Sequence, residues 1–581
     1  MNDYTAPLDD IVAALQLVGL DDVLALAVFE DLDIAAVREV LGGFAKLAGE
    51  VIAPTDRIGD TVGATLDVAS GVVTTAPELA NAFAEYSKGG WTALSAPVER
   101  GGGGFPGAVA TAVREMFGSA NMALSLNPVL TQSAIELLEL YGDDRQQEVF
   151  LSRLIDGTWT GTMNLTEPDA GSDLGAVRTT AAPTGDGRWL INGTKIYITW
   201  GEHELTDNII HLVLARAPEA PAGTKGISLF LVPKVIVDDD GGLHERNGVH
   251  ALALEHKMGI HASPTCVLQF DDAIGELVGP LHNGMAAMFS MMNPARVAIG
   301  LQGVSIGERS LQQASSFAAE RKQGRAGNVN PAPIASHPDV QRMLLDITVT
   351  VRAARMLVYA TSVAADLATH HPDEAVRAAS QARADLLTPL AKAWATDEGV
   401  RTSSLALQIH GGMGFIEETG IAQHYRDARI APIYEGTNGI QAMDLVGRKV
   451  SRDNGAAMNT LLDQITVTVD SASNLPTLKA AADSLGHAVD TVRAVTTWVV
   501  DTMRSDSPTV LAGATAYLEL AAKTVAGELL LREAIAAAEC GSTSADRLAA
   551  QLQFFVLEHL DRAPTVGSIT LGATLLATAL A

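Results

Sequence analysis

Residues 189–200 read WLINGTKIYITW, and the pattern of apolar and turn residues along the chain changes around this stretch. It belongs to a series of short runs of branched apolar residues separated by Gly, Pro and Asp. The series continues with NIIHLVLA (208–215), GISLFLVP (226–233) and CVLQF (266–270). Short apolar runs bounded by turn residues are typical of strands, and neighbouring runs joined by turns favour antiparallel pairing. We therefore expect an antiparallel β domain over residues 158–280.

The regions on both sides have a helical pattern. Ala- and Leu-rich stretches with apolar residues three to four apart precede the β region, as in IVAALQLVGL (11–20) and SAIELLELYG (133–142). Similar stretches return from Gly284, and a break at SRDNG (451–455) separates a last set of helices. We expect a multidomain α+β chain with a helical domain over 1–157, the β domain, a helical domain over 281–452 and an additional helical domain over 457–581.

The charge and cysteine content narrow the possible partners. Lys and Arg total 40 against 68 Asp and Glu in 581 residues, so the formal net charge is −28. This excess of acid disfavours nucleic acid and anionic membranes as partners.

The two cysteines, Cys266 and Cys540, lie far apart, and the histidines form no metal-like cluster, so we expect neither a disulfide nor a metal. The chain begins without an apolar signal, and its apolar tail of about 14 residues is shorter than the roughly 20 of a membrane helix. We expect a cytoplasmic protein.

Four segments concentrate Gly, Thr, Ser and Asn among apolar residues. They are GTMNLTEPDAGSD (161–173), NGTKIYITWGEH (192–203), LQIHGGMGF (407–415) and RDARIAPIYEGTNGIQ (426–441), with ERKQGR (320–325) between the second and the third. In this order and spacing they resemble the acyl-CoA dehydrogenase family. The longer N-terminus, the extra C-terminal helices and stretches such as HKMGIHASPT (256–265) further resemble the larger subfamily, which includes the mycobacterial broad-specificity type and the 3-methylmercaptopropionyl-CoA dehydrogenases. The resemblance implies a middle β-barrel, a C-terminal four-helix bundle and an additional helical domain.

The resemblance also implies a reaction and a base. Removal of hydrogen from Cα and Cβ of a thioester needs a base for the α proton and a hydride acceptor, which would be FAD. Glu435 matches the family's catalytic carboxylate. The alternative is that Glu435 is a first-turn acid at a helix N-terminus, capped by Thr437 or Asn438. Some family members place the base before the position of Arg296, but Ala295 stands there and cannot act as a base.

Other residues match the family's cofactor and substrate sites. The residues implied to contact FAD are Met163, Leu165, Thr166, Gly171, Ser172, Tyr197, Ile198, Thr199, Arg321, Gln323, Gln408, His410, Gly411, Gly412, Thr437 and Asn438. Among them, the MNLT segment (163–166) would contact the chain's own FAD, whereas Arg321, Gln408, His410, Gly411 and Gly412 would contact the FAD of a neighbouring subunit. Those implied to contact the acyl-CoA are Ser172, Asn293, Arg296 and Gly436.

Simpler interpretations of several of these residues stay open. EPDAGSD (167–173) is also typical of a surface turn, and KIYIT (195–199) of an ordinary half-buried strand. His410 is also explained as a structural residue and Arg296 as a helix arginine paired with an acid. Family members commonly have Phe-Gly shortly after the arginine, whereas this chain has Gln323-Gly324.

We therefore expect an FAD-dependent acyl-CoA dehydrogenase of fatty-acid β-oxidation that forms a trans-2-enoyl-CoA. The resemblance implies transfer of electrons to an electron-transfer flavoprotein and assembly as a homodimer or a dimer of dimers. Two alternatives remain from the sequence: an acyl-CoA oxidase that uses dioxygen, and a non-catalytic flavin- or nucleic-acid-binding protein on the same fold. The region after about residue 456 would extend the dimer interface or line the substrate channel. The acyl chain length, and any preference for a sulfur-containing chain, stay open.

Overall fold

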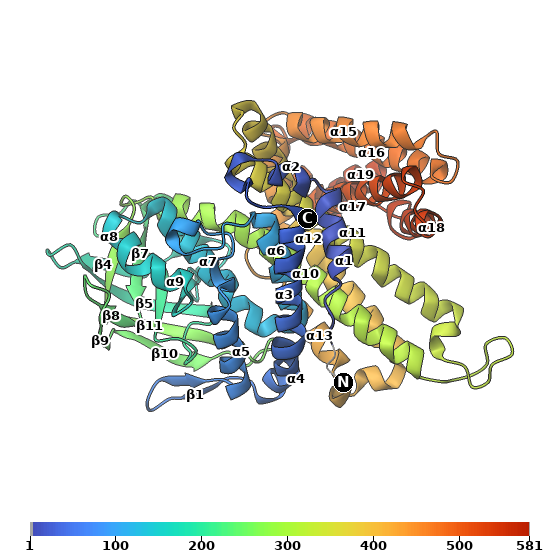
Figure 1. Cartoon of the computed structure of the whole chain (residues 1–581). Coiled ribbons are helices and arrows are strands. Elements are labelled where there is room, and N and C mark those ends of the chain that lie inside the picture. Colours follow the sequence, from blue (N-terminus) through green and yellow to red (C-terminus); the bar gives the residue numbers. More distant parts are fainter. Residues whose placement is uncertain (1–3, 580–581) are drawn as a thin grey trace. The chain divides into compact units, whose positions relative to one another are not determined.

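The computed structural model describes residues 4–579, leaving aside the side chains at 290, 291, 577 and 578. These residues form two compact units. The first comprises residues 4–6, 43–105 and 116–295, and the second comprises residues 7–42, 106–115 and 296–579. Each unit is described by itself, with the elements labelled as in Figure 1.

All the described strands belong to the first unit. Their bounds are β1 Thr65–Asp67, β2 Val72–Thr74, β3 Trp159–Asn164, β4 Thr180–Pro183, β5 Trp189–Thr199, β6 Asn208–Arg216, β7 Ile227–Pro233, β8 Val235–Val237, β9 Leu243–Arg246, β10 Val249–Leu254 and β11 Thr265–Val278. The β region expected over 158–280 therefore contains β3 to β11. β1 and β2 form a separate antiparallel pair earlier in the chain.

The main sheet closes into a ring. β4 pairs with β5, β5 with β11, β11 with β7, β7 with β6, and β6 again with β4, while β10 and β3 extend the ring at β11 and β6. Most of these pairs are antiparallel, as expected, but β3 pairs with β6 in parallel, and β4 meets β6 in parallel at Thr180 and Arg216. A parallel pair requires a crossover, and here β4 and β5 supply it, because they lie between β3 and β6 in the sequence.

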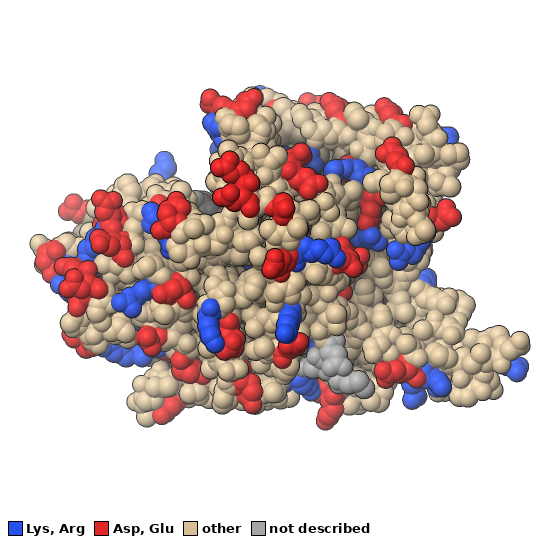
Figure 2. Space-filling view, in the orientation of Figure 1, with Lys and Arg blue, Asp and Glu red and all other residues tan. Residues whose placement is uncertain are grey.

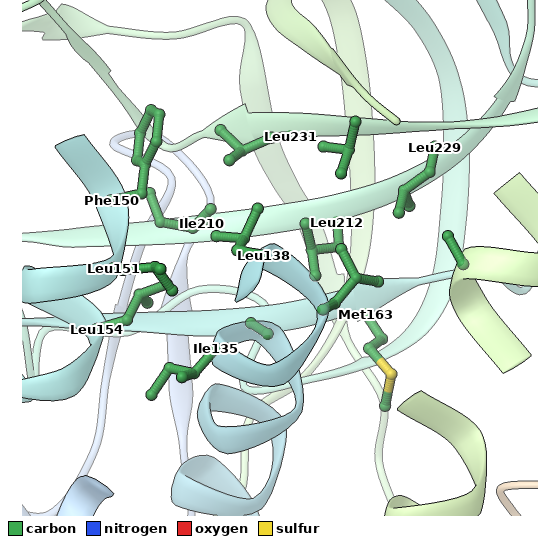
Figure 3. Close-up of a cluster of buried hydrophobic side chains, with 14 of the residues drawn as sticks. Ile135, Leu138, Phe150, Leu151, Leu154, Met163, Ile210, Leu212, Leu229 and Leu231 are labelled. Carbon is green, nitrogen blue, oxygen red and sulfur yellow. The ribbon is translucent and has the colours of Figure 1, made fainter. Parts of the chain in front are cut away.

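Helices of the first unit cover the ring and bury its apolar face. Ile135 and Leu138 on α7 pack with Ile210 and Leu212 of β6, as Figure 3 shows. The elements of this unit, with two helices that also extend into the second, are α3 Ile34–Leu47, η2 Ala48–Ile52, α4 Ala53–Val62, α5 Pro77–Lys88, η3 Trp91–Ala93, η4 Val98–Arg100, α6 Gly107–Ala120, α7 Met122–Tyr141, α8 Asp144–Gln146, η5 Gln147–Leu151, α9 Ser152–Ile155, η6 Leu174–Ala176 and η7 Gly223–Gly226.

The second unit is built from helices, many of them long. Pro294 lies inside α10 without ending it. The bounds are α1 Leu8–Leu17, α2 Leu20–Leu24, η1 Ala27–Phe29, α10 Gly284–Glu320 (its first turns belong to the first unit), η8 Ile334–Ser336, α11 Pro338–His370, α12 Glu374–Ile409, η9 Gly411–Phe415, η10 Glu417–Thr419, α13 Ile421–Ala428, α14 Asn438–Asp444, η11 Leu445–Val450, α15 Ala456–Ala472, α16 Lys479–Met503, α17 Ser507–Glu539, α18 Ala545–Phe555, η12 Val556–Leu560 and α19 Val566–Ala579.

Helices α10 and α12 approach almost to backbone contact. A Cβ added at Gly303 would lie 1.9 Å from the Ala395 carbonyl oxygen, and one added at Gly399 would lie 2.7 Å from the Gly303 Cα. Only glycine permits such an approach at these two positions. The contact brings side chains of both helices to the region where α14 begins.

A buried ionic cluster ties α6, α10 and α11 together. Arg355 donates to Glu115 at 2.7 Å and to Glu308 at 2.8 Å, and the Tyr359 hydroxyl donates to Glu115 at 2.6 Å. Each charged group in the cluster has an opposite charge or a hydrogen-bond partner, as burial requires. The cluster fixes the register of these three helices.

The helices after residue 456 pack together around α17, which also contacts α11, α12 and α14 (Figure 1). Among residues 4–579, no helix is long and apolar enough to cross a membrane. Figure 2 shows Asp and Glu spread over the visible face, with Lys and Arg between them.

Candidate active site

The turn that carries Glu435 has an unusual backbone. Glu435 has φ of 52° and Gly436 has φ of 81°, so two consecutive residues are left-handed. A left-handed residue other than glycine is strained, and such residues are found disproportionately at functional sites. The N-cap of α14 is Thr437, whose hydroxyl accepts the Ile440 N–H at 3.2 Å. Glu435 thus precedes the cap and is not in the first turn of the helix, although Thr437 does cap it.

Two buried cations stand near this turn. Arg296 comes from α10 and Lys392 from α12, and both side chains are almost completely buried. Burial raises the pKa of the Glu435 carboxyl, while the positive charges of Arg296 and Lys392 act in the opposite direction. The net result is a carboxyl with a raised pKa, as a general base near neutral pH requires.

The sequence left two interpretations of Arg296 open, a place near the substrate and an ion pair with an acid, and the position of Arg296 is compatible with both. It lies 3.5 Å from the Asp444 carboxylate on α14, so it is paired with an acid. Its guanidinium also lies 3.8 Å from the point where a Cβ on Gly436 would stand, so it is beside the Glu435 turn. Asn293 lies on the same helix, one turn earlier.

Lys392 was not singled out from the sequence. Its ammonium group donates to the Gly436 carbonyl at 2.9 Å and to the Asn438 Oδ1 at 2.8 Å. A lysine inside the apolar helical run LLTPLAKAWAT (386–396) is the signal that could have pointed to it. Lysine is rarely buried unless it has a specific partner.

Tyr434 and Gln302 form a second contact at the turn. The Tyr434 hydroxyl donates to the Gln302 Oε1, which ties the residue before Glu435 to α10. The Gln302 Nε2 is buried and has no hydrogen-bond partner among the described residues. The turn is therefore anchored on both sides of Glu435, at Tyr434 and at Gly436.

The residues expected to contact the flavin ring lie in the first unit, around the end of β3. Gly161 directs its N–H away from β6, to the Thr131 hydroxyl at 3.1 Å. Because backbone direction alternates along a strand, Met163 directs its N–H group to the same outer edge, and Leu165 follows directly after the end of β3. The Thr166 carbonyl then accepts the Ile196 N–H at 2.9 Å, which brings this edge to β5.

On β5, Tyr197 and Thr199 have different surroundings from Ile198. Tyr197 has φ of 60° and is 61% exposed. Thr199 lies opposite Thr265, whose buried hydroxyl has no partner among the described residues. The Ile198 side chain is buried in the core of the β domain, so only its backbone is available to a ligand.

A buried lysine fixes the edge formed by β3 and β5. Lys195 donates to the Leu165 carbonyl at 3.0 Å and to the Glu167 carboxylate at 2.8 Å, and burial lowers its pKa to about 8. Lys195, like Lys392, was not singled out from the sequence. Gly171 and Ser172 follow in an exposed turn, as the simpler interpretation of EPDAGSD expected.

The residues expected to contact a neighbour's FAD gather where α10 and α12 end in the second unit. His410 stacks on Phe317 with ring centroids 4.3 Å apart, and its Nδ1 donates to the Ala406 carbonyl. These contacts are those of a structural histidine. Arg321 lies one turn beyond Phe317, and its side chain is exposed, as are those of Gln323 and Gln408.

Gly411 and Gly412 form an open surface beside this group. A Cβ added at either glycine would have no atom within 4 Å. Glycine allows a phosphate group to approach the backbone closely, and the nearby arginine supplies a planar cation.

Comparison with known proteins identifies the family. Residues 162–273 match the acyl-CoA dehydrogenase middle domain, residues 282–450 the acyl-CoA dehydrogenase C-terminal domain, and residues 461–570 the acetyl-CoA dehydrogenase C-terminal-like domain. The 3-methylmercaptopropionyl-CoA dehydrogenase of Ruegeria pomeroyi is 45% identical over 542 residues, which cover 92% of this chain and 91% of that protein. The chain belongs to the acyl-CoA dehydrogenase family.

Two further similarities agree with this assignment. The broad-specificity linear acyl-CoA dehydrogenase FadE5 of Mycobacterium tuberculosis is 32% identical over 561 residues, covering 93% of this chain and 92% of that protein. The structure of Caenorhabditis elegans ACDH-11 in complex with C11-CoA superposes with a TM-score of 0.81 at 19% identity, covering 99% of this chain and 95% of that one. The expected fold class and the expected larger subfamily are thus confirmed, and the protein is an FAD-dependent oxidoreductase.

The residues of the first unit fit a flavin. The outward N–H group of Met163 is a main-chain donor of the kind that the polar edge of a flavin needs, and Tyr197 on β5 offers an exposed ring. The buried Thr265 hydroxyl without a protein partner within the described part of the chain lies on the same face as Thr199. A planar ligand with several hydrogen-bonding groups would satisfy such an edge.

Proposed function

We propose that this acyl-CoA dehydrogenase family member oxidises an acyl-CoA thioester to the trans-2-enoyl-CoA, with Glu435 as the base that removes the α proton. The observation that carries the proposal is the position of Glu435 in a strained left-handed turn beside the buried cations Arg296 and Lys392. Neither the strain nor the buried charge is needed to build a helix cap. Both are features of a side chain held for chemistry.

The chain's own residues carry the proton step. The raised pKa of Glu435 makes its carboxylate a stronger base than one in water, and Arg296 and Lys392 keep enough of it ionised to act. The Glu435 carboxylate accepts the α proton, and the buried cations stabilise the charges of the site as the proton moves. When bound, FAD would accept the hydride from Cβ, which no protein side chain can do reversibly.

Met163, Leu165, Thr166, Tyr197 and Thr199 would hold the flavin ring in the chain's own subunit. We also propose that Arg321, Gln408, Gly411 and Gly412 bind the pyrophosphate end of FAD from a second copy of the chain in a homodimer. The exposed arginine and the open glycine pair support this assignment. An electron-transfer flavoprotein would then receive the electrons, as the family resemblance implies. The name of one relative, the broad-specificity linear acyl-CoA dehydrogenase FadE5, supports a linear acyl-CoA as substrate.

The first test is the Glu435→Gln variant. This change keeps the shape of the side chain and removes the proton acceptor, so we expect kcat to fall by at least about 100-fold with the flavin still bound. Turnover of a linear acyl-CoA with a dye acceptor measures the loss, and the flavin absorbance measures cofactor content. Glu374→Gln, at an exposed position at the start of α12, is the control and should keep full activity. Activity of Glu435→Gln above a tenth of the wild-type value would rule out Glu435 as the base.

A further inference from the structure

Lys392 is buried in the second unit and holds the backbone around the base. It has 0% exposed surface. Its ammonium group donates to the Gly436 carbonyl, directly after Glu435, and to the side chain of Asn438, the first residue of α14. Both acceptors lie in the turn that sets the direction of the Glu435 side chain.

Asn438 strengthens this link between α12 and the turn. Its Nδ2 donates to the Ala393 carbonyl at 3.0 Å and to the Asp397 carboxylate at 2.8 Å, while its Oδ1 accepts from Lys392. The Thr396 hydroxyl also hydrogen-bonds to this side chain, so residues 392–397 of α12 hold the start of α14 through four groups, on Lys392, Ala393, Thr396 and Asp397. Of these groups, Lys392 alone also reaches the Gly436 carbonyl.

Charged groups on several elements face this position. Arg296 on α10 adds a second positive charge, which is itself paired with Asp444 on α14. Asp397 and Glu435 favour the charged form of Lys392, whereas burial and Arg296 oppose it, and the pKa of Lys392 is lowered to about 8. Glu519 on α17 acts on Asp397 from the C-terminal helices. Arg296 shares the Asp444 carboxylate with Arg448, whereas Lys392 contacts the turn without an ion-pair partner of its own within the described residues.

We propose that Lys392 is a positioning residue for the reaction: it holds the Glu435–Gly436 turn in its left-handed conformation and, together with Arg296, supplies positive charge that keeps the base ionised. Without the ammonium group, the Gly436 carbonyl would keep one donor among the described residues, the Gln441 Nε2 at 3.2 Å, which lies on α14 itself and does not tie the turn to α12. A neutral side chain at position 392 would also remove a nearby opposite charge from the Glu435 carboxylate. The first loss displaces the base, and the second makes it harder to ionise.

Two substitutions separate these effects. Lys392→Met removes the charge and the donor while keeping a long side chain, whereas Lys392→Gln removes the charge and keeps a donor. Lys523→Met is the matched control, because Lys523 is also a buried helix lysine of the second unit and pairs with Glu519 at 2.6 Å, one turn earlier on the same helix.

The first readout is the pH dependence of kcat/KM in the FAD-loaded enzyme. Loss of a nearby opposite charge typically raises a carboxyl pKa by about 1 to 3, so the acid limb should move to higher pH by at least about 1 in both Lys392 variants. At a fixed pH on the acid side of the limb, a limb that has moved by about one pH unit makes kcat/KM about tenfold lower than in the wild type. On the high-pH plateau, Lys392→Gln should be more active than Lys392→Met. Lys523→Met should keep the wild-type profile.

The second readout needs neither cofactor nor turnover. A water-soluble carbodiimide modifies protonated carboxyl groups, and mass spectrometry of the peptide that contains Glu435 gives the extent of modification at each pH. The midpoint for Glu435 should rise in both Lys392 variants and stay unchanged in Lys523→Met. An unchanged midpoint and an unchanged acid limb in Lys392→Gln would overturn the proposal, even if Lys392→Met failed to fold. A fall in thermal stability with the midpoint and the limb both unmoved would mean that Lys392 is only structural.

The inference rests on the proposed role of Glu435, but the two can fail separately. The carbodiimide midpoint reports the link between Lys392 and Glu435 whether or not Glu435 is the base. Turnover of Glu435→Gln reports the role of the base whether or not Lys392 acts on it.

Discussion

Two consecutive left-handed residues, Glu435 and Gly436, set the direction in which the carboxyl of the proposed base leaves the backbone. Glycine adopts this conformation without strain, whereas for a residue with a Cβ it costs about 1–2 kcal/mol. At Gly436 there is also a contact, because an added Cβ would lie 2.8 Å from the Gln441 Nε2. Glu435 already carries this cost, so a second residue with a Cβ at position 436 would add a similar cost next to it.

We therefore expect Gly436→Ala to lower kcat by about tenfold or more while costing only about 1–2 kcal/mol of stability. The matched control is Gly439→Ala, three residues later in the first turn of α14, where the nearest atom to an added Cβ is at 3.7 Å and φ is not left-handed. Steady-state kinetics and thermal melts of the two variants measure the difference. Equal activity of Gly436→Ala and Gly439→Ala would show that the left-handed turn does not position the base.

The sequence pointed to Glu435, the proposed base, but not to Lys392, which contacts the turn that follows it. Glu435 stands in a motif, IYEGTNG, whose residues are neighbours along the chain. Lys392 lies 44 positions from Gly436, and only the packing of α12 against α14 brings them together. A lysine in an apolar helical run is a visible anomaly, but its partner cannot be read from local pattern.

At the scale of elements, α10 and α12 set the distance between Arg296 and Lys392. Their contact at Gly303 and Gly399 leaves no room for a side chain. The strands were predicted well, since WLINGTKIYITW coincides with β5, Trp189–Thr199. The parallel pairing of β3 with β6 was not predicted, because the periodicity of a segment indicates that it is a strand but not which strand it pairs with.

We expect Gly303→Ala to destabilise the protein by about 1–3 kcal/mol, because the two helices must move apart to admit one methyl group. Gly486→Ala on α16 is the control: its added Cβ would meet only a side-chain atom at 3.7 Å, and replacing a helix-interior glycine should stabilise the helix by up to about 1 kcal/mol. Urea unfolding midpoints of both variants test this. A Gly303→Ala midpoint at or above that of the wild type would contradict the close packing.

At the scale of the whole molecule, acid acts on this protein in two opposing ways. Lowering the pH reduces the net charge of −28 and with it the self-repulsion. The β domain, however, contains His211 and His203, whose pKa values are lowered by burial and by the charge of Lys234. Such a histidine stays neutral in the folded protein at a pH where its unfolded form already gains a proton.

The pKa of His211 is lowered from 6.5 to about 3, so the unfolded state binds more protons between these values. The stability that neutral His211 contributes is complete above about pH 6.5 and is lost as the pH falls towards 3. At pH 5 the loss should be about 2 kcal/mol for this one residue. The urea midpoint should therefore fall between pH 7.5 and pH 5 in the wild type and fall less in His211→Gln. The exposed His250→Gln should behave as the wild type; an equal fall in His211→Gln would disprove the assignment.

The packing of α17 on α14 has a consequence for how the enzyme is made. Synthesis runs from the N-terminus, so a nascent chain contains every motif of the active site before α17, Ser507–Glu539, has left the ribosome. Until then, α14, which begins directly after the Glu435 turn, lacks its packing partner α17. We therefore expect a ribosome-bound chain with the complete motif set to be still immature, and the proposed activity to appear only after translation has passed the C-terminal helices.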